Sequence, residues 1–410
     1  MKVLFLNAYF TPEITAFTHL EDDLIAELIS GGHSIEIICP TPTRSVDKVV
    51  TKEYAHKKKE SLFGGAVEVR RFVCPREGKN PIVRAFRYFW CNFMEYCIAS
   101  KFENIDVVFS VSTPPTQGLL AAKVAKRLSK KYKRKVPFVF SLQDVFPDSL
   151  VTTGLTKKGS ILWNVGAKIE KITYKGADKI IVISNSMAAN IKNKGVFEDK
   201  ISVVSNWVDI TGVYPIEKDK NTLYNEFNIP KEKFTVVYAG NFGKAQGANV
   251  VLQSANLLKE EKDIQFVIFG GGSEFEKAKE QAKTMDNVII NPLLPANRVS
   301  EVYSLGDVSL VTCKKGVGNS GMPSKTWSIM ACNTPIIASF DTDSELADII
   351  KKAQAGFSVE PEDAKALADA ILEAKNKKLT SQGREYVLKY ASKDVCAKEY
   401  VNQMERLINI

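Results

Sequence analysis

Apolar and polar positions alternate along the first half of the chain with the periods of strands and helices. Val3 to Leu6 form a continuous apolar run, which is typical of a parallel strand buried on both faces. A segment with helical spacing follows at Thr18–Ile29, ends at Gly31-Gly32 and leads into a second strand at Ser34–Cys39. This order predicts a βαβ unit. The same alternation predicts further strands and helices at Asp106–Val111, Gly118–Lys130, Pro137–Leu142, Ile161–Tyr174, Lys179–Ser184 and Ile201–Val204.

The alternation pauses at Asn206–Pro215, a polar stretch that carries Trp207, and then restarts. In the second half it predicts strands at Phe234–Tyr238, Ile264–Phe269, Val288–Ile290, Val308–Thr312, Pro335–Ala338 and Gly356–Val359. Helices are predicted between and after them, among them Ala248–Lys259, Gly272–Met285, Ala364–Ala374 and a terminal helix at Lys393–Ile408. Both halves therefore have the pattern of a doubly wound α/β sheet with helices on both faces.

We predict two Rossmann-like α/β domains, at 1–205 and 206–392, with a terminal helix at 393–410 that crosses back to the first domain. A chain of 410 residues is long enough for two cores of roughly 200 residues each. In doubly wound sheets, ligands bind beyond the carboxyl ends of the strands. Two such domains that face one cleft are therefore expected to hold a ligand between them.

The composition is that of a soluble globular protein, with 45% hydrophobic and 25% charged residues. The apolar run at the start is too short for a signal peptide, and no stretch of about 18 apolar residues predicts a membrane-spanning helix. The seven cysteines are scattered, odd in number and without a CxxC pair, which argues against zinc and disulfide frameworks. These features predict a protein of the reducing cytoplasm.

The net charge of +9 is concentrated in the first half of the chain. Residues 1–205 carry 31 Lys and Arg against 20 Asp and Glu, a net charge of +11, and the remainder carries 25 against 27, a net charge of −2. We therefore expect the first domain to meet an anionic surface or an anionic acceptor. Nucleic acid is not an expected partner, because no recognisable reader motif accompanies the charge.

Two segments of the first half fit a membrane surface. Pro81–Cys97 mixes Arg84 and Arg87 with six aromatic residues at helical spacing, which predicts a helix on a membrane or, as an alternative, a buried helix between domains. Lys123–Lys135 contains eight Lys or Arg residues. This cluster predicts contact with anionic lipid headgroups, with a solvated helix face as the alternative.

Glycine-rich turns follow two predicted strands of the second half. Gly240–Gly247 contains three glycines between a strand and a helix, where backbone N–H groups can approach a phosphate. Its spacing matches neither named nucleotide fingerprint, and a tight turn is the alternative. Gly270-Gly271-Gly272 follows the next strand and forms either a flexible turn or a place where a ligand comes close.

A lysine lies at the start of a predicted helix in the segment that follows Gly321. Pro323 suits the first turn of a helix, and Ser324 offers a hydroxyl cap. Lys325 in the first turn opposes the helix dipole, an arrangement that makes sense if a diphosphate binds there. The alternative is a solvated lysine.

Two acidic segments are candidates for chemistry. Asp144 follows the strand at Pro137–Leu142, where its carboxylate can bond sugar hydroxyls, act on an acceptor or cap a turn. Asp341-Thr342-Asp343 has the form of a D-x-D metal pair but precedes a predicted helix at Ser344–Lys352. We interpret Asp343 and Ser344 as helix caps and predict no metal site.

In their order and spacing, these motifs resemble the family-four retaining glycosyltransferases of GT-B architecture, over nearly the whole chain. Within that family the sequence resembles the bacterial O-antigen, colanic-acid and capsule subgroup that includes L-fucosamine transferases. The resemblance rests on Tyr9–Glu13, Ser112–Pro115, Asp144–Asp148, Ser205–Asp209, Gly240–Gly247, Pro323–Lys325 and Met330–Cys332.

The sequence departs from the family where the family holds ribose and phosphate. The E-x7-E pair of the family falls at Ser320 and Ser328, and its second member holds the nucleotide ribose, so Ser328 is expected to make a weaker bond. The Arg and Lys of the family's phosphate loop align with Asn241 and Gln246. We therefore expect Lys325 to supply the missing positive charge.

The resemblance implies catalytic roles for Lys325 and Asp144. The donor-binding residues that it implies are Gly240, Asn241, Gly243, Lys244, Gln246, Gly271, Leu293, Pro323, Ser324 and Ser328. The acceptor-binding residues that it implies are Glu13, His19, Thr113 and Pro114.

The resemblance also implies α-retaining transfer, with an amino or deoxyamino sugar on UDP as the expected donor and neither a metal nor another cofactor. The leaving diphosphate is expected to be stabilised by Lys325, Lys244 and loop amides, and to take the acceptor proton itself. The expected acceptor is an undecaprenyl-diphosphate-linked saccharide. A cytoplasmic protein bound peripherally to the inner-membrane surface would reach it.

The sequence leaves two other functions open. A sugar-nucleotide 2-epimerase of the same fold needs acid and base groups around the sugar, whereas His19, His33 and His56, the three histidines, all lie before residue 60. A non-catalytic sugar-nucleotide-binding protein would explain the missing E-x7-E carboxylates. Such binding proteins are usually exported, which the absence of a signal peptide argues against.

Overall fold

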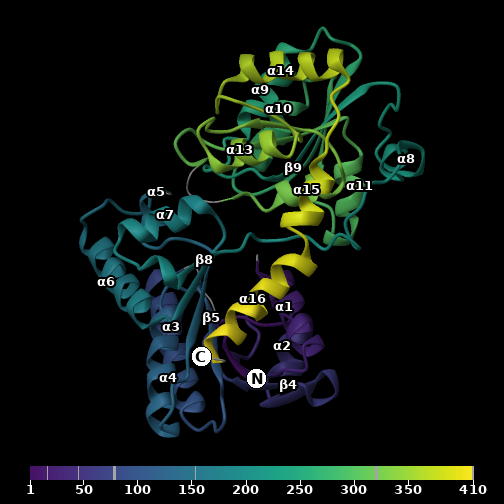
Figure 1. Cartoon of the computed structure of the whole chain (residues 1–410). Helices are drawn as coiled ribbons and strands as arrows, with labels where there is room; N and C mark the ends of the chain where they lie inside the picture. Colours follow the sequence, from purple (N-terminus) through teal and green to yellow (C-terminus); the bar gives the residue numbers. More distant parts are fainter. Residues whose placement is uncertain (16, 45, 77–79, 153, 319–321, 409–410) are drawn as a thin grey trace. The chain divides into compact units, whose positions relative to one another are not determined.

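The computed structural model describes residues 1–15, 17–44, 46–76, 80–152, 154–318 and 322–408 (Figure 1). The chain forms two compact units: unit 1 is Met1–Val204 with Ala397–Ile410, and unit 2 is Ser205–Cys396. The predicted division after residue 205 lies one residue from the observed one. The predicted terminal segment starts at 393, four residues before the chain joins unit 1.

Unit 1 contains a sheet in which the described strands pair in the order β3-β4-β2-β1-β5-β6-β7-β8. β1 pairs in parallel with β2 and β5, and β3 runs antiparallel to β4 at one edge. The chain proceeds outwards from β1 on one side and from β5 on the other, so the strand order reverses between them. The strands are β1 (Lys2–Leu6), β2 (Ser34–Pro40), β3 (Lys59–Leu62), β4 (Val67–Phe72), β5 (Val107–Val111), β6 (Phe138–Leu142), β7 (Lys179–Val182) and β8 (Ile201–Val203).

Helices cover both faces of this sheet, because its central strands are apolar on both sides. Leu4, Val108 and Phe138 share one core with residues of α3, α4 and α7. On the other face, Tyr400 of α16 lies against the Phe109 ring, with the ring centres 6.4 Å apart. The helices of unit 1 are α1 (Thr18–Ser30), α2 (Lys48–Tyr54), α3 (Pro81–Ala99), α4 (Gln117–Tyr132), α5 (Asp148–Thr152), α6 (Ile161–Gly176), α7 (Asn185–Asn193) and the unit's share of α16 (Lys393–Ile408).

Unit 2 contains a parallel sheet in which the described strands pair in the order β11-β10-β9-β12-β13-β14. Val237, Val267 and Val311 pack with α11, α12 and α13 on one face. Their neighbours Val236 and Ile268 pack with α9, α10 and α14 on the other. This is the predicted doubly wound arrangement. The strands are β9 (Phe234–Asn241), β10 (Ile264–Gly271), β11 (Val288–Pro292), β12 (Val308–Thr312), β13 (Ile336–Ser339) and β14 (Gly356–Val359).

The helices of unit 2 follow its strands, and their bounds differ from the predicted ones by a few residues at each end. They are α8 (Leu223–Glu226), α9 (Asn249–Leu257), α10 (Phe275–Ala282), α11 (Val299–Ser304), α12 (Lys325–Ala331), α13 (Glu345–Lys352), α14 (Ala364–Lys377) and α15 (Gly383–Tyr390). In neither unit do the described residues include a helix with the length and apolar character needed to cross a bilayer.

Several elements were not predicted from the sequence pattern, among them α2, β3 and β4. β4 alternates buried and half-buried positions until Arg71, which is 4% exposed. The Arg71 guanidinium donates to the Thr11 carbonyl oxygen at 2.7 Å and pairs with Glu60 of β3 at 3.2 Å. Arg71 can be buried because its charge is paired, but a charged residue interrupts the apolar pattern by which a strand is recognised in a sequence. The strand is therefore seen only in the folded chain.

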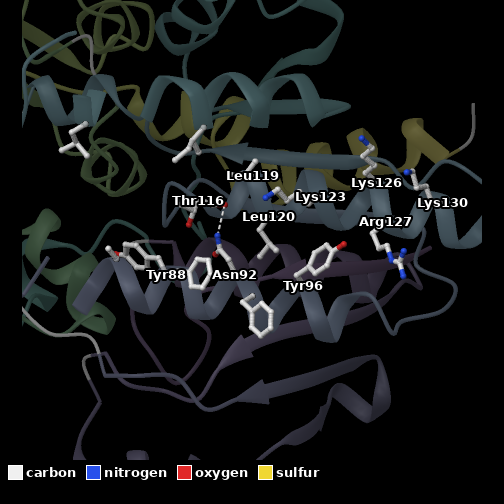
Figure 2. A pocket seen from close by; sticks show the side chains of 15 residues that line it. Tyr88, Asn92, Tyr96, Thr116, Leu119, Leu120, Lys123, Lys126, Arg127 and Lys130 are labelled. Atoms are coloured by element: carbon white, nitrogen blue, oxygen red, sulfur yellow. Dashed lines mark hydrogen bonds between the residues drawn. The ribbon is translucent and has the colours of Figure 1, made fainter. Parts of the chain in front are cut away.

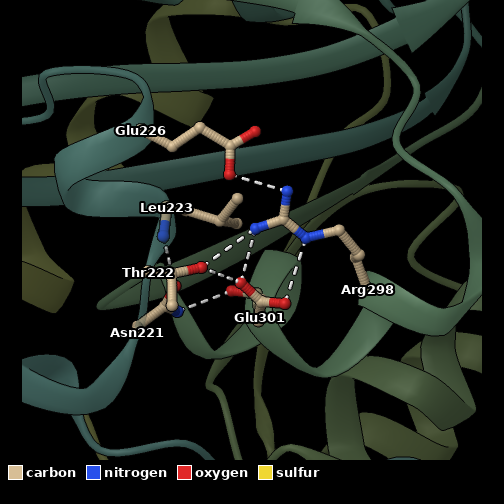
Figure 3. Close-up of polar contacts among 6 residues, drawn as sticks. All are labelled: Asn221, Thr222, Leu223, Glu226, Arg298 and Glu301. Carbon is tan, nitrogen blue, oxygen red and sulfur yellow. Dashed lines mark hydrogen bonds and ion pairs between the residues drawn. The ribbon is translucent and has the colours of Figure 1, made fainter.

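Figure 3 shows a polar network that joins α8 to α11 in unit 2. Arg298 Nη1 donates to Glu226 at 2.7 Å, and its Nε and Nη2 donate to the two carboxylate oxygens of Glu301 at 3.0 and 2.6 Å. Asn221 Nδ2 donates to the backbone carbonyl of Glu301 at 2.7 Å. These bonds raise the pKa of Arg298 and lower that of Glu301, so both groups stay charged at neutral pH.

Arg298→Met is expected to lower the free energy of unfolding of unit 2 by about 1–3 kcal/mol, because Glu226 and Glu301 both lose a charged donor. Lys365→Met is the matched control. It removes an ion pair with Asp369 whose side chains are 77% and 58% exposed, and is expected to cost under about 0.5 kcal/mol. Urea unfolding measures both. Equal midpoints for the two variants would show that the network adds no stability.

Candidate active site

The candidate site lies where the strand order of unit 2 reverses, between β9 and β12. From this point β9, β10 and β11 proceed to one side and β12, β13 and β14 to the other. Open α/β sheets bind ligands beyond the carboxyl ends of their strands at such a switch point. The loop Gly240–Gly247 follows β9 here, and Lys325 begins α12 after the segment that leaves β12.

The ammonium group of Lys325 lies inside the protein. Its Nζ lies 4.4 Å from the centre of the Tyr238 ring and so close to Gly240 that a Cβ there would collide with it. Nζ is inaccessible to solvent and has no hydrogen-bond partner among the described residues. The alternative of a solvated lysine is therefore wrong.

An ammonium group buried without an ion pair costs free energy, because a ring contact replaces only part of the lost hydration. Burial lowers the pKa of Lys325 from 10.5 to about 8, and no acidic group contributes to the shift. An anion bound at the switch point would supply the missing partner. Within the described residues, Lys325 thus presents a buried positive charge that lacks an anionic partner.

The loop after β9 is held against the residues that leave β12. Thr312 Oγ1 donates to the Gln246 carbonyl oxygen at 2.7 Å. Gly247 has a φ of +57°, and a Cβ there would lie 2.7 Å from the Cys313 carbonyl oxygen. A glycine is thus required both by the left-handed backbone and by the close approach. The loop is thus a tight turn held against the residues that follow β12, and phosphate binding by its N–H groups stays a prediction.

Asn241 and Gln246, which stand where the resemblance expects two cations, bond to each other. Asn241 Nδ2 donates to Gln246 Oε1 at 3.3 Å, and the Tyr238 hydroxyl donates to the Asn241 carbonyl at 3.1 Å. Gly243 lies against the same amide, since a Cβ there would be 2.6 Å from Gln246 Oε1. The hydrogen bond between the two amides fixes the loop but gives it no positive charge. The ammonium of Lys325, which lies beside Gly240, is a positive charge next to this loop.

The two glycines at the end of β10, Gly270 and Gly271, have different neighbours, so a side chain would be excluded at each for a different reason. Gly270 packs against the Phe275 ring, which a Cβ would meet at 2.5 Å, so packing alone requires it. Gly271, a predicted donor residue, lies beside Leu293, whose Cδ1 a Cβ would meet at 3.4 Å. Leu293 follows β11 and is 53% exposed. Gly271 and Leu293 are therefore neighbours at the carboxyl edge of the sheet, as a shared ligand site requires.

The structure corrects the role of Ser324 at the start of α12. Ser324 occupies the N-cap position, but its backbone is helical and its side chain makes no capping hydrogen bond. The Pro323 carbonyl accepts from Thr326 N at 3.0 Å and forms the first turn. Ser328 lies one turn after Lys325 and is partly exposed. Ser320, the other position of the absent E-x7-E pair, lies outside the described residues.

Lys244 lines a different part of unit 2. It borders a polar depression of about 500 Å³ together with Glu274, Lys314 and Glu362. Lys325 does not line this depression. The expected help of Lys244 with the leaving diphosphate stays a prediction.

Asp341 holds a backbone loop and does not form a pair with Asp343. Its two carboxylate oxygens accept from Gly316 N at 2.9 Å and Gly318 N at 2.7 Å. Ser344 caps α13 through its side chain, as predicted, whereas the interpretation of Asp343 as a second cap is wrong: it is exposed, and the cap of α13 is Ser344 alone. Within the described ranges, no three His, Cys, Asp or Glu side chains group in a way that could hold a metal ion.

In unit 1 the expected acceptor residues follow strands at the switch point between β1 and β5. His19 lies in the first turn of α1 and is exposed, as is Thr113 after β5, whereas Pro114 is buried. Asp144 follows β6, the next strand, and is also exposed. Desolvation raises the pKa of Asp144, and a hydrogen bond from Ser149 opposes the shift.

Glu13, the fourth expected acceptor residue, is fully buried and engaged with the backbone. Its Oε1 accepts from the N–H groups of Thr43 and Arg44, each at 2.7 Å. Burial raises the pKa of Glu13 although these bonds and the nearby Arg87 oppose it. Glu13 thus fixes the loop after β2. A contact with an acceptor would have to use Oε2, which has no hydrogen-bond partner in the described part of the chain.

Tyr238 is a site residue that the sequence did not reveal. It lies in β9 with no exposed surface, and burial raises the pKa of its hydroxyl to about 12. Its ring contacts the Lys325 ammonium, and its hydroxyl donates a hydrogen bond to the backbone carbonyl of Asn241. A buried tyrosine in an apolar strand gives no local signal of this role, because the contact joins residues far apart in the sequence.

Two protein families match the two halves of the chain. Residues 22–211 match the family described as Glycosyltransferase Family 4, and residues 219–394 match Glycosyl transferases group 1. The two matches divide the chain at nearly the place where the structure divides into units.

Bacterial relatives match most of the chain. A probable glycosyltransferase, WbjE of Pseudomonas aeruginosa, is 29% identical over 78% of each chain. The putative colanic acid biosynthesis glycosyl transferase WcaI of Escherichia coli is 24% identical over 98% of this chain and 100% of its own. An N,N'-diacetylbacillosaminyl-diphospho-undecaprenol alpha-1,3-N-acetylgalactosaminyltransferase of Campylobacter jejuni is 24% identical over 87% and 89%.

Solved structures confirm the fold as GT-B. Sucrose-phosphate synthase from Thermosynechococcus elongatus superposes with a TM-score of 0.76 at 16% identity, over 100% of this chain and 99% of its own. HepE of Anabaena in complex with UDP superposes with a TM-score of 0.70 at 14% identity, over 99% and 100%. Two doubly wound units, each with a switch point, are the architecture that they share with this chain.

Proposed function

As a chain built from a Glycosyltransferase Family 4 domain and a Glycosyl transferases group 1 domain, this protein is a glycosyltransferase, and we propose that it transfers a sugar from a UDP-sugar to a lipid-linked saccharide. The product would belong to a bacterial surface polysaccharide, a capsule or O-antigen. The names of WbjE, WcaI and the Campylobacter transferase support this role.

The observation that carries the proposal is the buried ammonium of Lys325 at the switch point of unit 2, which has no hydrogen-bond partner among the residues that the structure describes. A bound diphosphate would be the anionic partner that this ammonium lacks among the described residues. In our mechanism, Lys325 stabilises the charge that develops on the leaving diphosphate, which is preorganised electrostatic catalysis. We propose metal-independent, α-retaining transfer, in which Lys325 supplies positive charge to the leaving diphosphate and the leaving phosphate takes the acceptor proton.

The donor that we propose is a UDP-linked amino or deoxyamino sugar. HepE of Anabaena, a structural neighbour, has been solved with UDP and with UDP-glucose. The name of the Campylobacter relative describes the transfer of an N-acetylgalactosaminyl group. Asn241, Gly271, Leu293 and Ser328 lie at or near the carboxyl edge of the sheet, where they would contact the nucleotide and its sugar.

The acceptor that we propose is an undecaprenyl-diphosphate-linked saccharide, bound by unit 1 at the inner face of the cytoplasmic membrane. The Campylobacter relative is named for a diphospho-undecaprenol acceptor. The net charge of +11 in residues 1–205 favours an anionic acceptor. His19, Thr113 and Asp144 are exposed at the β1/β5 edge, where a saccharide would bind.

Donor binding tests the proposal. Thermal unfolding would be followed with UDP-N-acetylglucosamine, UDP-N-acetylgalactosamine and their deoxy analogues, with GDP- and dTDP-sugars as controls. We expect one UDP-amino sugar to raise the unfolding temperature most, because binding to the folded state alone stabilises it. Stabilisation by no nucleotide sugar would contradict the proposal. Release of free sugar epimer in place of glycosylated acceptor would assign the chain to the epimerases instead.

Donor binding is expected to weaken above about pH 8. Unliganded Lys325 is protonated below its pKa of about 8, and the dianionic diphosphate binds the protonated form, so bound donor raises that pKa. The Kd for the UDP-sugar should be flat between pH 6 and 8 and then rise by up to about tenfold per pH unit. Calorimetry at several pH values measures this. Lys325→Met should bind weakly with no such dependence, and a Kd unchanged up to pH 9.5 in the native protein would exclude Lys325 from the diphosphate site.

A further inference from the structure

A large groove crosses one face of unit 1, and neither the donor site nor the acceptor residues account for it. Its volume is about 950 Å³, and residues of three helices line it: α3, α4 and α6. α4 contacts α3 on one side and α6 on the other, so it forms the middle of the groove. Figure 2 shows Tyr88, Asn92 and Tyr96 of α3 along one wall and the basic side chains of α4 at the other.

The walls of the groove are apolar and partly exposed. Phe89 and Phe93 of α3 line it and are 69% and 50% exposed, and Leu162 of α6 lines it and is 54% exposed. Next to it, Phe86 and Ile161 are 56% and 85% exposed. A contiguous exposed apolar surface of this kind marks a place where a protein meets a partner or a membrane. The outer face of α3 is therefore not buried within unit 1.

Seven of the eight basic residues in Lys123–Lys135 fall into two sets with different surroundings. Lys131 Nζ donates to the Phe102 carbonyl at 2.8 Å, Arg134 pairs with Asp106 and Lys135 with Asp178, so these residues stabilise unit 1. The other set lines the groove, is exposed and forms no ion pair within the described residues: Lys123, Lys126, Arg127 and Lys130.

The combination of an apolar groove and an unpaired basic row defines the occupant. An apolar peptide would leave the four cations without partners, and a nucleic acid would leave the apolar walls exposed to water. An anionic amphiphile satisfies both, because its hydrocarbon chain fills the groove and its phosphate meets the cations. A bilayer surface presents such molecules side by side and also covers the exposed rings that flank the groove.

We propose that the α3–α4–α6 groove seats an acyl chain of an anionic phospholipid, with the headgroup phosphate on Lys123, Lys126, Arg127 and Lys130. This contact docks unit 1 on an anionic membrane. The inference does not rest on the proposed transfer reaction, because docking needs neither donor nor acceptor. The two can therefore fail separately.

Vesicle sedimentation tests the contribution of charge. We expect the full chain to bind vesicles of phosphatidylcholine mixed with phosphatidylglycerol, and to bind vesicles of phosphatidylcholine alone far more weakly. The fourfold variant Lys123→Gln, Lys126→Gln, Arg127→Gln and Lys130→Gln should lose binding to the mixed vesicles by about 100-fold or more. The matched control removes four exposed lysines of unit 2, Lys259→Gln, Lys262→Gln, Lys277→Gln and Lys351→Gln, and should keep its binding.

Chain insertion is tested separately. Phe89→Ser with Phe93→Ser should weaken binding to mixed vesicles by about tenfold or more, whereas Leu257→Ser, at an exposed leucine of unit 2, should not. Trp90 lies 6.2 Å from the Phe93 ring. Phospholipids brominated on the acyl chain should quench tryptophan fluorescence, and Trp90→Phe should remove most of that quenching.

Three results would overturn the proposal. Equal loss of binding in the two fourfold variants would mean that only total charge matters. Full binding by the phenylalanine variants, without acyl-chain quenching, would mean that no chain enters the groove. Unchanged vesicle binding by all groove variants, combined with slower transfer to a detergent-solubilised acceptor, would assign the groove to the acceptor lipid. Because every substituted side chain except Trp90 is exposed, unfolding temperatures close to that of the native protein are expected and confirm that the variants fold.

Discussion

Lys325→Met is expected to reduce kcat/KM for the UDP-sugar by at least about 100-fold and, at the same time, to make the unliganded protein more stable. The loss of activity follows because the charge that stabilises the leaving diphosphate is removed from a buried position, where electrostatic stabilisation is strongest. Methionine keeps the apolar stem over the Tyr238 ring, so the fold of the site is preserved.

The gain in stability follows from the pKa of Lys325. Its folded value of about 8 lies below the ordinary value of 10.5, so the unfolded chain binds more protons between these two pH values. Below pH 8 the buried charge costs up to about 3 kcal/mol, and stability recovers as the pH rises from 8 to 10.5. Replacement by methionine removes this cost. The unfolding temperature of the variant without ligand should therefore exceed that of the native protein at pH 7.

Calorimetric unfolding with and without UDP-sugar measures both effects in one series. The variant should unfold at a higher temperature alone and gain almost nothing from donor, whereas the native protein gains. Lys277→Met is the control, because Lys277 is an exposed lysine of unit 2 that has no expected role at the donor site. If Lys325→Met lowers the unfolding temperature and leaves turnover intact, Lys325 has a structural role and the donor assignment is wrong.

Gly247→Ala is expected to lower kcat/KM by about 100-fold, because the added Cβ would lie 2.7 Å from the Cys313 carbonyl oxygen. The loop must then move away from the residues that leave β12, and a shift of about 1 Å at a catalytic site can cost this much. The φ of +57° at Gly247 adds backbone strain for a residue with a side chain.

Gly316→Ala separates the effect of backbone strain from the effect of the close contact. Gly316 has a φ of +78°, so alanine there is strained to a similar degree, but no atom lies within 4 Å of the added Cβ. We expect Gly316→Ala to lose some stability and little activity, with steady-state kinetics and thermal unfolding as the measurements. Similar kinetic losses in the two variants would show that the close approach of Gly247 does not position the phosphate loop.

The sequence by itself determined the architecture of this protein. Continuous apolar runs such as Val3 to Leu6 and Phe266 to Phe269 are typical of parallel strands buried on both faces, and their alternation with helical segments specified two doubly wound units. The same local patterns located Gly240–Gly247 at the carboxyl end of a strand and Lys325 at the start of a helix. Periodicity and turn residues act over a few positions, which is why the sequence shows them directly.

Only the tertiary structure decided what the side chains do. It placed the ammonium of Lys325 beside the Tyr238 ring, and it showed that Glu13 accepts hydrogen bonds from the backbone at Thr43 and Arg44. It also showed that the buried Arg71 of β4 is paired with Glu60, which explains why the apolar pattern did not reveal this strand. It also divided one basic cluster into a structural set and a set that lines the α3–α4–α6 groove. The physical reason is that burial and ion pairing join residues far apart in the chain, and the cost or benefit of a charge depends on those distant neighbours.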